Sequence, residues 1–93
     1  MVKAKKVQAF KFVPQATLDY HLFGILNDFE IEKILREFLE DSHFVGYGSV
    51  LIITGKGKIV RPLVTKFLKS SPLVEKAVPE SSNDGALEVT LKS

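Results

Sequence analysis

Two stretches of the chain place hydrophobic residues at helical spacing. The first repeats them at i, i+3, i+4, i+7 and i+8, through Ile31, Ile34, Leu35, Phe38 and Leu39. This stripe predicts a helix that ends near Ser42. Asn27, with Glu30 three residues later, is the pattern of a capping box at its start. A second stripe predicts another helix, through Val60, Leu63, Val64, Phe67 and Leu68. Pro62 fits this second helix only in its first turn.

Other segments have the character of strands. Residues 17–20 are rich in β-favouring types. Residues 50–53 form a continuous apolar run, which is typical of a strand covered on both faces. Two short strands are expected at 73–78 and 86–91, around a turn at 83–85. The last strand alternates apolar and polar positions, as a half-exposed strand does, with Leu87, Val89 and Leu91 against Glu88 and Thr90.

The predicted order of elements is β-α-β-α-β-β. Right-handed crossovers make the first two strands parallel, and both helices then pack on the same sheet. The sequence therefore predicts a two-layer α/β sandwich with a mixed four-stranded sheet. We expect one domain over residues 16–93, preceded by a basic N-terminal arm at 1–15.

The composition narrows the class of protein. The chain contains no cysteine, which excludes disulfides, cysteine nucleophiles and thiolate metal sites. Its longest purely apolar run, residues 50–53, is far shorter than the roughly 20 residues of a membrane span. No apolar signal-peptide core follows the basic N-terminus. We therefore expect a cytosolic monomer with no membrane partner.

Positive charge is concentrated in two segments. The net charge is +2, yet residues 1–12 carry +4, residues 55–69 carry +5 without an acid, and the remainder sums to −7. Such segregation indicates an electropositive surface that faces an anion. The alternative is that Lys66 and Lys69 merely form the solvated side of a helix.

The first candidate for chemistry is the pair Asp19 and His21, where the first predicted strand ends. Two residues apart in an extended chain, they project to the same face. A carboxylate beside an imidazole fixes the tautomer of the ring and raises its basicity, which suits a general base. The alternative is that Asp19 binds backbone amides at the strand exit and His21 is an incidental loop residue. Two such side chains without a third are thin evidence for a metal site, so Mg²⁺ is left as an open alternative.

The second candidate is the segment from Thr54 to Lys58, between a predicted strand and a predicted helix. Glycines in such a turn expose backbone N–H groups beside the positive end of the helix dipole, which makes an anion site. The amides of Gly55 and Gly57, with Lys56, would hold a phosphate, and the alternative is a simple tight turn. The spacing differs from that of a nucleotide-binding P-loop. The candidate nucleic-acid-binding residues are Thr54, Gly55, Lys56, Gly57, Lys58 and Arg61.

Both clusters follow neighbouring parallel strands, so we expect them at the same edge of the sheet, where open α/β sheets bind ligands. An acid–base pair beside a phosphate-binding loop describes a phosphodiester site, with Asp19 orienting His21, which would activate water or stabilise the leaving group. The leading hypothesis is a nucleic-acid-binding domain that nicks DNA or RNA. The alternatives are a non-catalytic module that binds DNA, RNA or the ribosome, and a protein-interaction domain.

The two motifs resemble those of the Smr (small MutS-related) domain family. Residues 18–21 (LDYH) resemble its LDxH motif, and residues 54–57 (TGKG) resemble its TGxG or HGxG motif. The closing stretch 85–91 is similar to the last strand of the family. The likeness extends over residues 16–92, in the same order.

The resemblance implies a fold similar to the C-terminal domain of a bacterial translation initiation factor. It also implies nucleic-acid binding, with endonuclease activity on DNA, including branched structures, or on RNA. Some relatives are fused to a MutS-like ATPase, of which these 93 residues contain nothing, so mismatch recognition is not implied. The family usually has glycine directly after the motif histidine, whereas Leu22 and Phe23 precede Gly24 here.

Overall fold

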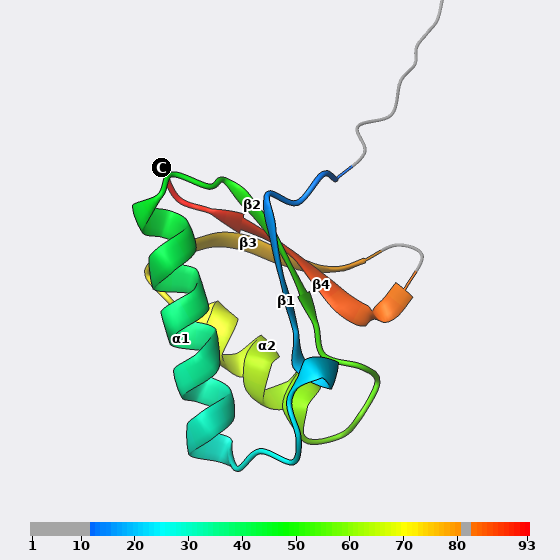
Figure 1. Cartoon of the computed structure of the whole chain (residues 1–93). Coiled ribbons are helices and arrows are strands. Elements are labelled where there is room, and N and C mark those ends of the chain that lie inside the picture. Colours follow the sequence, from blue (N-terminus) through cyan, green and yellow to red (C-terminus); the bar gives the residue numbers. More distant parts are fainter. Residues whose placement is uncertain (1–11, 81–82) are drawn as a thin grey trace, which may run out of the picture.

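The computed structural model describes residues 12–80 and 83–93 of the chain. Its elements are β1 (Ala16–Asp19), the 3-10 turn η2 (Tyr20–Leu22), α1 (Asp28–Phe44), β2 (Ser49–Ile53), α2 (Val60–Ser70), β3 (Val74–Glu80) and β4 (Asn83–Leu91). The strands form one sheet in the order β1-β2-β4-β3, in which β1 and β2 are parallel and the other neighbours are antiparallel. Figure 1 shows both helices on one side of the sheet. The predicted two-layer sandwich with a mixed sheet is therefore confirmed.

Only one face of the sheet is covered by helices. The connections from β1 to β2 and from β2 to β3 step across the sheet in the same direction, so right-handed crossovers place both helices on the same face. The expectation that residues 50–53 are covered on both faces is therefore wrong. Val50 and Ile52 face the helices with 0% exposure, whereas the other face of β2 is half-buried, at Leu51 and Ile53.

The helix α1 begins with a capping box, as its sequence predicts. The Glu30 N–H donates to the Asn27 side-chain oxygen at 2.8 Å, and the Asn27 N–H donates to the Glu30 carboxylate at 2.9 Å. The helix ends at Phe44 rather than near Ser42. The stripe residues that are fully buried are Ile31, Leu35 and Leu39. Among the described residues, no helix is both long and apolar enough to cross a membrane.

The final hairpin differs from its prediction. The turn expected at 83–85 is wrong, because β4 already begins at Asn83, which pairs with Glu80 of β3. The N–H groups of residues 54–55 both donate to the Gly85 carbonyl at 2.9 Å, and these bonds hold the segment against the end of β2. The alternation predicted for the last strand is confirmed by the burial of Leu87, Val89 and Leu91.

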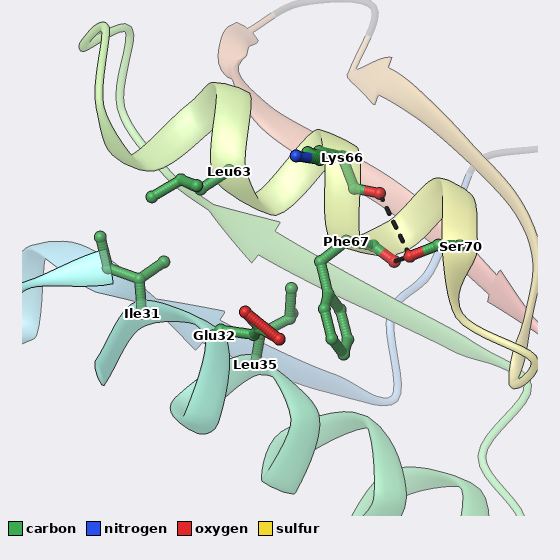
Figure 2. A pocket seen from close by; sticks show the side chains of 7 residues that line it. All are labelled: Ile31, Glu32, Leu35, Leu63, Lys66, Phe67 and Ser70. Atoms are coloured by element: carbon green, nitrogen blue, oxygen red, sulfur yellow. Dashed lines mark hydrogen bonds between the residues drawn. The ribbon is translucent and has the colours of Figure 1, made fainter. Parts of the chain in front are cut away.

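The two helices also pack against each other. Figure 2 shows the Phe67 ring pointing from α2 toward α1, beside a pocket of about 170 Å³ between the helices. At the end of α2 the Ser70 hydroxyl donates to the Phe67 carbonyl at 3.1 Å. Residues of the two candidate clusters are absent from the lining of this pocket, which is formed by Ile31, Glu32, Leu35, Leu63, Lys66, Phe67 and Ser70. The pocket is therefore separate from the candidate site.

The chain joins the sheet just before β1. The Gln15 N–H donates to the Ser49 carbonyl at 2.7 Å, and the Gln15 side-chain oxygen accepts the Gly48 N–H at 2.6 Å. Gln15, at the end of the expected arm, is thus held by the sheet. The lysines of that arm, within residues 1–11, lie outside the described residues.

Candidate functional site

Asp19 and His21 are in direct contact. One oxygen of Asp19, Oδ1, accepts the His21 N–H at 2.9 Å and lies 3.0 Å from His21 Nδ1. A carboxylate can only accept hydrogen bonds, so the proton of this second contact belongs to Nδ1, and in the neutral ring the lone pair then lies on Nε2. The His21 side chain is 64% exposed, whereas that of Asp19 is 29% exposed. The ring is thus oriented by a partner that is itself more buried.

The contact arises from a turn rather than from an extended strand. β1 ends at Asp19, and His21 belongs to the 3-10 turn η2 that Asp19 caps. The prediction that the side chains of Asp19 and His21 project to the same face is correct. The reason given for it, the alternation of side chains along an extended strand, is wrong. The hydrogen bond from the His21 backbone to Asp19 also realises the structural alternative, in which Asp19 binds a backbone amide at the strand exit. The Asp19 carboxylate therefore both caps the turn and contacts the imidazole ring.

Tyr20 anchors this turn from the inside. It is buried, and its hydroxyl donates to the Ile31 carbonyl in the first half of α1 at 2.8 Å. Burial raises the pKa of the Tyr20 phenol above its usual value. Its ring also lies near that of Phe23, with 6.2 Å between the ring centroids. The sequence analysis did not identify this residue, although an aromatic residue between two polar ones in the motif is a signal of an inward-facing position.

The two candidate clusters meet at Gly55. This glycine has φ +75°, and a Cβ added to it would stand 2.8 Å from His21 Nε2. Only glycine satisfies both requirements without strain or displacement of the imidazole. The nitrogen that carries the lone pair therefore lies directly against the loop predicted to bind phosphate. Gly57 is different, because nothing that the structure describes lies within 4 Å of a Cβ placed there.

The start of the loop is held by the neighbouring strand. The Thr54 hydroxyl donates to the Gly55 carbonyl at 2.7 Å, and the N–H groups of both residues donate to the Gly85 carbonyl. The expectation that the Gly55 amide holds a phosphate is therefore wrong, because this N–H is already engaged. Thr54 is buried and shapes the loop from below. Gly85, which was not identified as a site residue, supports the loop through its carbonyl.

The rest of the loop is exposed and basic. Lys56 and Lys58 are exposed, and Arg61 is half-buried in the first turn of α2. Among the described residues, no side chain caps the start of α2 and no acidic residue lies in its first turn. The positive end of this helix dipole therefore adds to the charges of the loop. Lys66 and Lys69 are exposed on α2, as expected for the solvated side of a helix.

Other side chains considered for chemistry lie apart from this site. The described residues contain no group of three or more His, Cys, Asp or Glu side chains that could hold a metal ion. The pair offers a single carboxylate, that of Asp19, and its Oδ1 already accepts two contacts. His43, the second histidine, lies half-buried in the last turn of α1, at the opposite end of that helix.

Known proteins share this fold. The family model of the Smr domain matches residues 22–92. The structure is similar to the Smr domain of Thermus thermophilus MutS2, with a TM-score of 0.71 and 20% identity, over 87% of this chain and 100% of that one. It is also similar to YdaL, a stand-alone small MutS-related protein from Escherichia coli, with a TM-score of 0.70 and 29% identity, over 89% of this chain and 69% of that one. No curated protein sequence matches the chain.

The family match extends over most of the chain and over the whole of the 54–61 loop. It begins directly after His21, so the roles of Asp19 and His21 depend on their geometry rather than on the match. The order of the strands and the two helices on one face agree with the fold that the motifs imply. With residues 22–92 matched, the chain belongs to the Smr domain family.

Proposed function

We propose that this Smr domain binds nucleic acid through residues 54–61 and cleaves a phosphodiester bond of DNA or RNA, as an endonuclease. One observation carries the proposal. His21 is oriented by Asp19 through Nδ1, while its Nε2 lies against Gly55 in the basic loop. A base and an anion-binding segment are thus in contact, although they are more than thirty residues apart in the sequence.

The loop supplies positive charge for a phosphate. Its donors are the side chains of Lys56, Lys58 and Arg61, with the dipole of α2 behind them, since the Gly55 N–H is engaged by Gly85. If about four phosphates are contacted, raising the salt from about 50 to 200 mM weakens binding roughly 10²-fold. Reversing the charge at all three positions to Glu removes binding. The same reversal at three exposed lysines elsewhere, Lys33, Lys76 and Lys92, serves as the matched control.

The pair then performs general base catalysis. As the oxygen of a water molecule attacks the phosphorus, its proton passes to His21 Nε2, and the bond from phosphorus to the leaving oxygen breaks. Asp19 keeps the ring in the required tautomer and stabilises the imidazolium that forms. Such assistance contributes typically about 10²–10⁴-fold to the rate, so its loss is measurable.

The test compares wild type with His21→Ala and Asp19→Asn on supercoiled plasmid and on structured RNA, with and without Mg²⁺. Both variants are expected to lose cleavage, while their affinity for the same substrate changes less than about threefold, because the base acts in the chemical step. The double variant is expected to be no worse than His21→Ala, since Asp19 acts through His21. His43→Ala is the control and retains full activity. Cleavage that survives in His21→Ala contradicts the proposed mechanism.

A second candidate function is a non-catalytic module that binds DNA, RNA or the ribosome. The observation that favours it is the bond from the His21 N–H to Asp19, because capping a turn is a sufficient structural reason for the position of Asp19. This function predicts a wild-type protein that binds polynucleotides in a salt-dependent way and cuts none of them. A protein-interaction domain, in contrast, has no salt-dependent affinity for polynucleotides.

A further inference from the structure

Exposed hydrophobic side chains gather at one end of the molecule. In the described part of the chain, five of the eight large hydrophobic residues that are exposed belong to the segment that follows His21 or to the loop before α2. We call these five the apolar rim: Leu22, Phe23, Ile25, Phe29 and Ile59. Figure 1 shows their segments, the turn η2, the start of α1 and the loop before α2, at the same end of the fold.

The density of the apolar rim distinguishes it from ordinary surface. Ile25 is 104% exposed and Leu22 is 83% exposed, within a stretch of eight residues that also holds Phe23 and Phe29. Single hydrophobic residues scattered on a surface are normal, whereas several exposed within one short stretch beside a polar site indicate an interaction site. The rim therefore indicates a partner that has apolar surface to cover it.

The charges beside the rim indicate the chemistry of that partner. Ile59 lies between Lys58 and Arg61, and Leu22 follows the histidine that touches Gly55. A partner that fits must carry phosphates for the loop and, close to them, apolar faces for the rim. Unpaired nucleotides do so, because their bases expose flat faces that stack on hydrophobic and aromatic side chains. Duplex DNA or RNA hides those faces in its base stack.

We propose that the apolar rim contacts unpaired bases on either side of the phosphate held by the loop, so that the domain selects single-stranded nucleic acid over duplex. This inference rests on the proposed phosphate binding. The segment 22–29 contacts bases on one side of His21, and Ile59 contacts bases on the side of the helix α2. Selection of strand form then comes from the rim, while affinity common to all polynucleotides comes from the lysines and arginine of the loop.

The test measures fluorescence anisotropy with three probes of the same sequence length: a single strand of about 15 nucleotides, its duplex, and a single strand without bases. The rim variant combines Leu22→Ser and Ile25→Ser, whose side chains are too exposed to support the fold. It is expected to lose roughly tenfold in affinity for the normal single strand, because two apolar side chains that cover the faces of the bases are removed. Its affinity for the duplex and for the strand without bases changes less than about twofold, with an unchanged salt dependence.

A matched control carries Phe44→Ser and Val45→Ser, two exposed hydrophobic residues at the other end of α1, and binds all three probes as wild type does. The proposal is overturned if the rim variant binds the single strand as well as wild type, or weakens equally on all probes. Vesicles with anionic lipid are a fourth probe. If the rim variant loses vesicle binding but keeps its affinity for the single strand, the rim is a membrane contact instead. If wild type binds no polynucleotide at all, the proposed function itself fails.

Discussion

His21 and Gly55 join the two halves of the candidate site through a single close contact. The backbone of Gly55 is in the left-handed region, at φ +75°, and its Cα hydrogen points at His21 Nε2 where a side chain would collide. Asp19 holds the ring from the opposite nitrogen. At the scale of single residues, the position of the base therefore depends on a carboxylate at one side and on the absence of a side chain at the other.

Gly55→Ala tests this dependence. The substitution places a residue with a Cβ in the left-handed region, which costs about 1–2 kcal/mol of unfolding free energy, and it pushes the imidazole away from the loop. We expect a lower stability in urea unfolding, a changed chemical shift of the His21 ring in NMR spectra, and loss of any cleavage. Gly57→Ala is the control, with a stability within about 0.5 kcal/mol of wild type. An unchanged ring signal in Gly55→Ala would mean that the contact does not position His21.

Tyr20→Phe tests the anchor below the turn. Because burial raises the pKa of the Tyr20 phenol in the folded state, the unfolded chain releases this proton at a lower pH than the folded chain does. The contribution to stability is complete below pH about 10, the usual pKa, and is lost as the pH rises further. Urea unfolding from pH 7 to 11 should show a steeper loss in wild type than in Tyr20→Phe. Tyr47→Phe is the control and should lose stability with pH as steeply as wild type. An equal pH dependence of stability in wild type and Tyr20→Phe would show that burial of the Tyr20 phenol does not cause the loss.

Helix α1 links the core to the candidate site at the scale of elements. Its buried stripe packs against the sheet, and its first turn receives the chain directly from the segment that carries most of the apolar rim. The capping box sets where the helix starts, and the Ile31 carbonyl of the same helix receives the Tyr20 hydroxyl. The first turns of α1 therefore hold the segment between η2 and α1 at both ends, through Tyr20 on one side and the Asn27 cap on the other.

Asn27→Ala removes the cap from this helix. Loss of an N-cap side chain costs about 1 kcal/mol, because a backbone N–H of the first turn loses its partner. For a domain of this size that lowers the midpoint of thermal unfolding by roughly 4–8 °C. Glu40→Ala, exposed in the last part of α1, is the control and changes the midpoint little. A midpoint equal to that of wild type would show that water replaces the cap without loss.

On the scale of the whole molecule, basic and acidic residues lie on different elements of the fold. The basic stretch 55–69 comprises the loop at the candidate site and most of α2, while α1 carries many of the acids. The chain before Gln15 adds further lysines, three of which lie within residues 1–6. These residues contribute charge to binding whatever path they take, since electrostatic attraction to a polyanion depends little on sequence.

Deletion of residues 1–6 tests how much these lysines contribute to nucleic-acid binding. The slope of the logarithm of affinity against the logarithm of salt concentration should become less steep by at most about 3, because up to three phosphate contacts are lost. The midpoint of thermal unfolding should stay the same, since within the described residues the chain joins the sheet at Gln15. A large loss of thermal stability would show instead that the deleted segment packs on the domain.

The elements and their order can be predicted from the amino-acid chain alone. The helical stripes, the Asn27–Glu30 box and the alternation of Leu87, Val89 and Leu91 are local patterns, because helix faces, caps and strand faces depend on residues a few positions apart. The handedness of crossovers extended these patterns to a parallel pair and a two-layer fold. The two polar clusters were found in the same way, as breaks in the apolar pattern at strand ends.

How these parts meet depends on contacts between distant segments, which exist only in the folded molecule. The residues 83–85 have the composition of a turn, yet they lie in β4, because Asn83 pairs with Glu80 and the Gly85 carbonyl accepts the N–H groups of residues 54–55. That same bond withdraws the Gly55 amide from the phosphate site. The contact between His21 and Gly55 likewise joins positions far apart in the chain. The three cases share one physical reason. Each depends on a hydrogen bond or a close approach between residues that are distant in the chain, and patterns a few residues long do not specify which distant segments meet.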